Sequence, residues 1–156
     1  MTYILVVASF LLPLGIILPD EKTEDDIKEA VFRYMFDHEA RQQKPYAKYY
    51  FIGIGKVGEG DDPSQDFMKR FEENIPIVKR MSQSTVSSSG IVVDKETSDG
   101  GIRFSVSGIR WIKENQAEVE AGYYVAGLFA GGCEYGVVLE DGKWVVKGCA
   151  GKRWIS

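Results

Sequence analysis

The side chains best suited to acid–base chemistry in this sequence are one histidine and a nearby tyrosine. His38 is the only histidine among the 156 residues, and Tyr34 precedes it by one helical turn. An imidazole titrates near neutral pH, so His38 has the chemistry of a general acid or base, with Tyr34 as a hydrogen-bond donor. The alternative is a structural histidine that hydrogen-bonds to the backbone at a helix end, and we favour this reading. The flanking residues Asp37 and Glu39 point elsewhere on a helical projection, which makes them poor partners for the imidazole.

Aromatic side chains in the last third of the chain are the candidates for a binding surface. They would line a pocket or one face of a sheet, although burial in a core is the commoner fate of such residues. The candidate pocket or binding residues are Trp111, Tyr123, Tyr124 and Tyr135, with Phe129 beside them.

A helix is needed to position His38. The segment Thr23–Asp26 has a capping threonine followed by carboxylates, which favours the start of a helix. Apolar residues then recur on one side of a helical projection, and His38 lies in this stripe. We expect the helix to run to about Gln43, because Pro45 disfavours its continuation. A second helix is expected from Asp62, acting as its cap, to about Asn74.

Four alternating segments at the carboxyl end of the chain predict an antiparallel meander. Their ranges are 102–112, 117–126, 133–140 and 143–150. Asp141-Gly142 between the last two is a strong hairpin signal. Shorter extended segments are expected at 48–55, 77–81 and 91–93. We therefore predict a sheet with helices packed over it.

The hairpin turn also bears on the two cysteines. A two-residue turn pairs Glu140 with Lys143 and gathers the apolar side chains on one face, so we prefer this register. It places Cys133 and Cys149 on opposite faces, where they cannot form a disulfide. A bulge at Gly148 would bring them together, and an oxidising compartment would favour the bond. The Cys133–Cys149 disulfide thus stays open as an alternative that the register does not favour.

No cofactor, metal or nucleic-acid site is predicted. Residues 53–58 spell G-x-G-x-x-G but precede an acidic loop rather than a helix, so a dinucleotide site is not expected. Two cysteines without further cysteine or histidine neighbours make a poor metal site. The net charge is −4 and the basic residues are scattered, which argues against a nucleic-acid surface.

The amino terminus predicts export. Residues 1–19 are almost wholly apolar, as expected for a signal peptide or membrane anchor. They lack a preceding cation and a small-residue cleavage site, so cleavage and retention both stay open. Residues 20–26 are predicted to form an acidic spacer, and residues 27–156 one domain. The folded part would lie outside the cytoplasm, touching the membrane only through an uncleaved leader.

The predicted order of elements resembles a known α+β family. A helix, a strand, a second helix and a run of antiparallel strands, ending in Gly142-Lys-Trp-Val-Val-Lys and Trp154-Ile155, is similar to the cystatin-like roll. This is the fold of nuclear-transport-factor-2-like domains, polyketide cyclases and ketosteroid isomerases. The resemblance implies a curved antiparallel sheet wrapped on an N-terminal helix, with a conical pocket between them. Short matches such as Asp62-Pro-Ser also resemble exported bacterial proteins of unknown activity.

Three functions follow from these features. We favour an exported binding or accessory domain that takes a small molecule or protein on its pocket or sheet face. One alternative is an isomerase- or cyclase-type enzyme with His38 in the conical pocket, although we lean against an enzyme. The other is an assembly domain that forms a homodimer through Val138 and Val145 on the outer sheet face.

Overall fold

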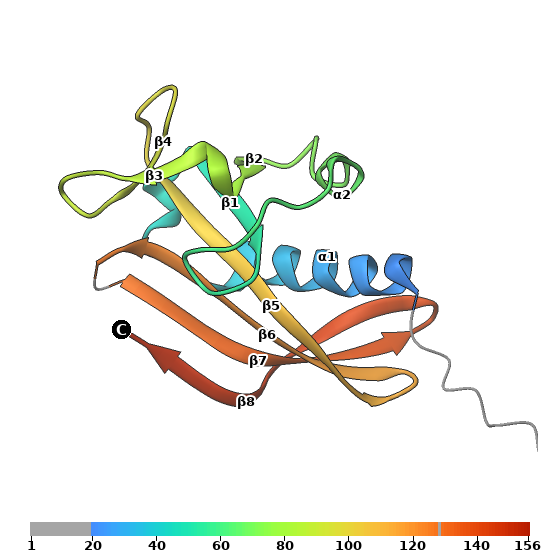
Figure 1. Ribbon diagram of the computed structural model, residues 1–156. Coiled ribbons are helices and arrows are strands. Elements are labelled where there is room, and N and C mark those ends of the chain that lie inside the picture. Colours follow the sequence, from blue (N-terminus) through green and yellow to red (C-terminus); the bar gives the residue numbers. More distant parts are fainter. Residues whose placement is uncertain (1–19, 128) are drawn as a thin grey trace, which may run out of the picture.

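The computed structural model describes residues 20–127 and 129–156, in which one six-stranded sheet dominates (Figure 1). The predicted leader, residues 1–19, lies outside the described part. The strands lie in the order β2-β1-β5-β6-β7-β8. In chain order they are β1 (Tyr49–Ile54), β2 (Ile77–Arg80), β5 (Gly101–Lys113), β6 (Gln116–Ala126), β7 (Phe129–Glu140) and β8 (Lys143–Ile155). Two short strands, β3 (Ser84–Val86) and β4 (Val92–Asp94), form a separate antiparallel pair.

The long helix α1 (Glu21–His38) begins earlier and ends earlier than predicted. Asp20 caps it by accepting a hydrogen bond of 2.8 Å from the Thr23 N–H, so the residues expected to form an acidic spacer are the first turns of the helix. The helix ends at His38 instead of near Gln43. Ala40 then has a φ of 49°, which is incompatible with a continuing helix.

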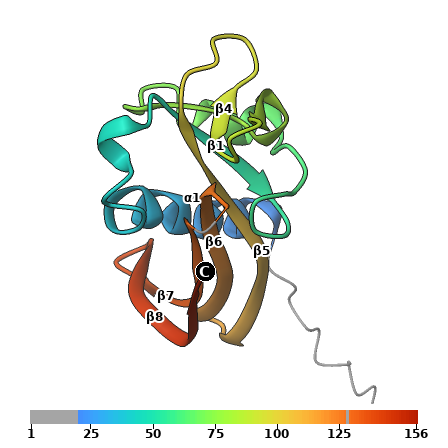
Figure 2. The same ribbon diagram turned by 90° about the vertical axis from the view of Figure 1, so that its left-hand side faces the viewer.

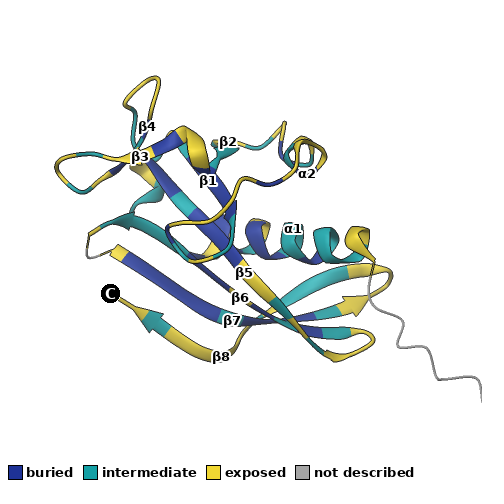
Figure 3. Cartoon of the chain, viewed as in Figure 1, coloured by how far each residue is buried: buried dark blue, intermediate teal, exposed yellow. Residues whose placement is uncertain are grey.

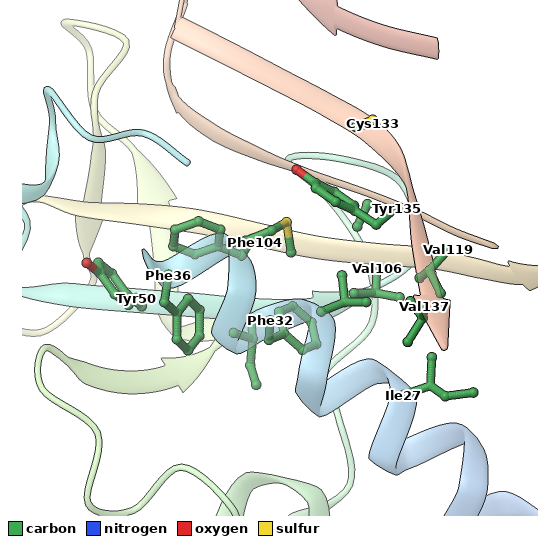
Figure 4. Close-up of a cluster of buried hydrophobic side chains, with 14 of the residues drawn as sticks. Ile27, Phe32, Phe36, Tyr50, Phe104, Val106, Val119, Cys133, Tyr135 and Val137 are labelled. Carbon is green, nitrogen blue, oxygen red and sulfur yellow. The ribbon is translucent and has the colours of Figure 1, made fainter. Parts of the chain in front are cut away.

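Helix α1 crosses one face of the sheet and contacts β5, β6, β7 and β8 (Figures 1 and 2). Ile27, Phe32 and Phe36 project from it into a core that also receives side chains from the strands, including the fully buried Tyr135 of β7 (Figure 4). Ile27, Val31 and Met35 of the predicted stripe are buried, whereas His38 at its end is exposed, and the buried face extends instead through Phe32 and Phe36.

The predicted fold class, a cystatin-like α+β roll with an antiparallel sheet wrapped on the helix, is wrong. Strands hold 50% of the residues and helices 21%, and the sheet is mixed. Strand β1 runs parallel to both of its neighbours, β2 and β5. The sequence marked these segments as extended but gave no sign of their direction, because strand direction depends on partners distant in the chain.

The antiparallel meander β5-β6-β7-β8 is confirmed, as is the register of its last hairpin from the turn to Val137. Glu140 pairs with Lys143, and Leu139 pairs with Trp144. Asp141 and Gly142 have φ values of 48° and 75°, the two positive values that a tight hairpin turn requires.

The expectation that the cysteines do not bridge is also wrong, because the register shifts farther along the same hairpin. The shift falls between Gly136 and Val137, so that Gly136 pairs with Gly148 and Tyr135 pairs with Cys149. Gly148 adopts a φ of 108°, which a residue with a side chain rarely does. The shift turns Cys149 to the face that carries Cys133, and the two form a disulfide with their Cα atoms 5.8 Å apart.

The second helix, α2 (Gln65–Lys69), is much shorter than predicted. Ser64, and not Asp62, caps it, accepting a hydrogen bond of 3.2 Å from the Phe67 N–H. The carboxylate of Asp62 instead accepts a hydrogen bond of 2.8 Å from the Ser82 N–H. Single 3₁₀ turns at Lys44–Tyr46 and Met81–Gln83 complete the described elements.

Candidate functional site

The structure places His38 at the exposed carboxyl end of α1, where it contacts its own helix. Its ring stacks on that of Tyr34, with centroids 4.1 Å apart. Its Nδ1 lies 2.9 Å from the Tyr34 carbonyl oxygen. Since a carbonyl can only accept, Nδ1 must carry the proton that forms this bond. The imidazole therefore binds the backbone of the last helical turn, in the geometry expected of a structural histidine.

A buried carboxylate next to His38 organises the polar groups of this region. Glu39 follows α1 directly and is only 6% exposed. It accepts a hydrogen bond of 2.8 Å from the Tyr135 hydroxyl. The Nη2 atom of Arg153 in β8 donates to the same carboxylate oxygen over 3.1 Å. We call Tyr34, Glu39, Tyr135 and Arg153 the Glu39 cluster. Burial of a carboxylate is tolerated when it is paired and hydrogen-bonded in this way.

Burial and the Glu39 carboxylate raise the pKa of two tyrosines in this region, Tyr135 and Tyr123. Burial raises the pKa of Tyr135 far above its ordinary value, and the neighbouring Glu39 carboxylate adds to the effect. The pKa of Tyr123 is raised by burial first and by Glu39 second. The hydrogen bond to Glu39 raises the pKa of Arg153. Tyr135 and Tyr123 hence stay neutral, and the hydrogen bonds of Glu39 to Tyr135 and Arg153 join the end of α1 to strands β7 and β8.

The predicted site residues are only partly brought together. Tyr34 packs edge-on against Tyr135 at 5.6 Å between centroids, so Tyr34, His38 and Tyr135 lie side by side. Tyr124 follows Tyr123 in β6 and thus faces the opposite side of the sheet. Trp111 pairs with Ala117 near the start of β6 and packs on Trp144, away from the Glu39 cluster.

The sequence analysis missed Glu39 and Arg153. Glu39 was assigned a direction from a helical projection, which does not apply because the helix has already ended. Arg153 lies beyond the last predicted strand. Small and charged residues alternate near Arg153. This local pattern does not predict that Arg153 pairs with Glu39, which lies 114 positions earlier.

A groove of about 310 Å³ lies at the opposite edge of the sheet, between α2 and β2. It is lined by Gln65, Met68, Lys69, Phe71, Glu72, Ile77, Val78, Lys79, Arg80 and Gln83. All four residues of β2 line it. Because successive side chains of a strand point to opposite faces, a hollow lined by every residue of β2 opens onto the edge of that strand.

Apolar side chains are exposed beside this groove. Ile77, which lines the groove, is 58% exposed, and Ile75, two residues before it, is 94% exposed. Val78 in the middle of β2 packs against the core. The groove thus combines an unpaired strand edge with exposed aliphatic groups, a combination typical of protein-binding surfaces.

The charges of the groove differ in whether they are already paired. Lys69 lies 2.8 Å from Asp66, and Lys79 lies 2.8 Å from the buried Asp94. Arg80 and Glu72, in contrast, form no ion pair within residues 20–127 and 129–156. Among the described residues, Arg80 is therefore the cation of the groove without an ion-pair partner.

Two other hollows are less suited to a ligand. One of about 220 Å³ on the outer face of the meander is lined by Glu118, Glu120 and Glu134, and also by Arg110, which already pairs with Glu118. The other, of about 500 Å³, contains Arg33 and Arg70, whose guanidinium groups already bond to the acidic residues of α1. The described residues contain no group of three or more His, Cys, Asp or Glu side chains that could hold a metal ion. They also contain no helix that is both long and apolar enough to cross a membrane.

Comparison with known proteins assigns no function to this chain, so the groove is the main basis for a functional proposal. No protein-family model matches the chain, and neither the curated proteins nor the solved structures contain a match.

Proposed function

We propose that this protein is an exported binding domain that captures an extended segment of a partner protein at the edge of β2. The observation that carries the proposal is the groove between α2 and β2, which every residue of β2 lines. An extended peptide binds such an edge by adding a strand to the sheet, and pockets for alternate side chains then supply specificity.

The backbone groups around the groove are consistent with this mode of binding. The Asn74 side chain donates to the Pro76 carbonyl over 2.8 Å, just before β2 begins. The Gln83 side chain accepts from the Arg80 N–H over 3.0 Å, where β2 ends. Both hydrogen bonds lie at the ends of the strand. The middle of the edge, at Val78, is left for backbone bonds to a bound segment.

The export part of the proposal has two supports. The disulfide between Cys133 and Cys149 is compatible with an oxidising compartment outside the cytoplasm. The apolar residues 1–19 have the composition of a leader.

Selection from a library of random peptides tests the binding function, because it needs no candidate partner. The peptides are displayed on phage and selected on the purified domain, and the enriched peptides are synthesised. We expect them to slow hydrogen exchange at residues 77–80 and to bind Ile77→Lys much more weakly, because a charged side chain then stands at the groove. Ile112→Lys, the same substitution at an exposed isoleucine of β5, is the matched control and should bind like the wild type.

Two results would overturn the proposal. One is a failure to enrich any peptide over an unrelated protein. The other is protection from exchange that falls outside β2 and α2, with Ile77→Lys binding as tightly as Ile112→Lys.

A further inference from the structure

We infer, on the basis of the proposed function, that the captured segment runs parallel to β2 and presents a carboxylate to Arg80. The position and charge of Arg80 carry this inference. Arg80 is the last residue of β2 and lines the groove.

Arg80 is the cation in the groove that is available to a ligand. Lys69 and Lys79 already bind Asp66 and Asp94, whereas Arg80 forms no ion pair with any described residue. A guanidinium group binds a carboxylate through two parallel hydrogen bonds, which gives both strength and geometric selectivity. A carboxylate is therefore the group that best complements this end of the groove.

The direction of the bound segment follows from the position of Arg80, the last residue of β2. A segment parallel to β2 places its carboxyl end beside Arg80, where its carboxylate meets the guanidinium group. An antiparallel segment places its carboxyl end at the start of β2, away from Arg80. The charge of Arg80 thus sets the direction of the ligand, since a strand edge by itself accepts partners of either direction.

The groove also limits the length and polarity of the segment. Four residues of strand span about 13 Å, so about four residues of ligand cover β2. The apolar part of the lining consists of Met68, Phe71, Ile77 and Val78. The ligand class is accordingly a short extended peptide with an apolar residue in its middle and a carboxylate at its carboxyl end.

That carboxylate has two sources, the α-carboxylate of a chain terminus or an acidic side chain within a longer chain. Peptides selected from a pool with free carboxyl ends are synthesised in free and amidated forms, with and without their Asp and Glu residues. Loss of binding on amidation assigns the α-carboxylate, and loss on removal of Asp or Glu assigns a side chain. Either result supports the inference.

Substitution of Arg80 makes the test specific. We expect Arg80→Gln to weaken carboxylate-bearing peptides about tenfold or more, because a charged hydrogen bond is lost. Peptides already stripped of their carboxylates should bind Arg80→Gln and the wild type equally. Arg41→Gln, at an exposed arginine outside the groove, is the matched control and should change nothing.

The outcomes separate this inference from the proposed function. Peptides that protect residues 77–80 but bind equally well without any carboxylate, and equally well to Arg80→Gln, would overturn the carboxylate inference while the binding function stands. A preference for peptides whose carboxylate lies at the amino end would overturn the parallel direction. Peptides that protect no residue of β2 would overturn the proposed function itself.

Discussion

The two edges of the sheet, β2 and β8, are built in opposite ways. Strand β8 has 13 residues and is exposed along most of its length (Figure 3). It carries Lys143, Lys147, Lys152 and Arg153 and no acidic residue, and its register with β7 shifts twice. Lysines and bulges on an edge strand oppose pairing with another chain. Strand β8 thus has the features of an edge protected from strand addition.

Strand β8 is also firmly attached to the rest of the molecule. The Cys133–Cys149 disulfide joins it to β7, and Arg153 joins it to the buried Glu39 at the end of α1. Strand β2 has only four residues and no such covalent fastening. Its tertiary anchors are the packing of Val78 and the ion pair from Lys79 to Asp94.

The contrast indicates which edge is available for binding. A long edge that is protected by charge and held by a disulfide serves stability, and a short edge with a groove and exposed isoleucines suits a partner. The following predictions test this division, beginning with the fastening of β8.

Removal of the disulfide should have the largest effect. For a loop closed across a separation of 16 residues, we expect the Cys133→Ser, Cys149→Ser double variant to lose about 3 kcal/mol of unfolding free energy, because the unfolded chain gains freedom. Urea denaturation measures the loss, and hydrogen exchange should quicken in β8 but not in β2. Reduction of the wild type is the control. A loss under about 1 kcal/mol, or faster exchange in β2 alone, would contradict the proposed fastening of β8.

The Glu39 cluster should contribute the next largest effect. Tyr135→Phe removes the buried hydroxyl that donates to Glu39, and we expect a loss of about 2 kcal/mol, as is typical for a hydrogen bond to a charged group. Tyr34→Phe is the matched control, because the Tyr34 hydroxyl forms no hydrogen bond to a described residue. We expect that variant to change stability by less than about 0.5 kcal/mol. Equal losses in the two variants would show that the cluster does not act through this hydrogen bond.

The anchor of β2 should be weaker than either of these and should depend on pH. Burial acts to raise the pKa of Asp94, but hydrogen bonds from Lys79 and from the backbone N–H groups of Thr97 and Glu96 outweigh it and lower the pKa below 3.8. A carboxyl group with a lowered pKa stabilises the fold above its unfolded pKa, and this stability is lost as the pH falls through its folded value.

We therefore expect Asp94→Asn to be less stable than the wild type at neutral pH, with the difference shrinking below about pH 4. The asparagine keeps an oxygen to accept the two backbone hydrogen bonds, and Lys79 is close enough to solvent to be hydrated, so the loss is the smallest of the three. Denaturation curves from pH 7 to pH 2.5 measure the difference. A difference that does not vary with pH would exclude the carboxylate as the anchor.

The sequence by itself determined the parts of this protein that depend on local pattern. The alternation of residues in the carboxyl-terminal third predicted the four-strand meander, and Asp141-Gly142 predicted the last turn and the pairing of Glu140 with Lys143. The apolar stripe of α1 likewise predicted the burial of Ile27, Val31 and Met35, although it included the exposed His38 and left out the buried Phe32 and Phe36. These features arise within a few neighbouring residues, where side-chain periodicity and turn geometry decide the structure.

Only the tertiary structure decided the features that join distant residues. The parallel direction of β1 against β2 and β5 depends on crossover connections that no local pattern specifies, and this made the predicted antiparallel roll wrong. The disulfide required a register shift beside Gly148, and one residue of shift moves a side chain to the other face of a sheet. Glu39 accepts hydrogen bonds from Tyr135 and Arg153, which lie 96 and 114 residues away in the sequence. A buried carboxylate must be paired, and only the folded chain brings these donors to it.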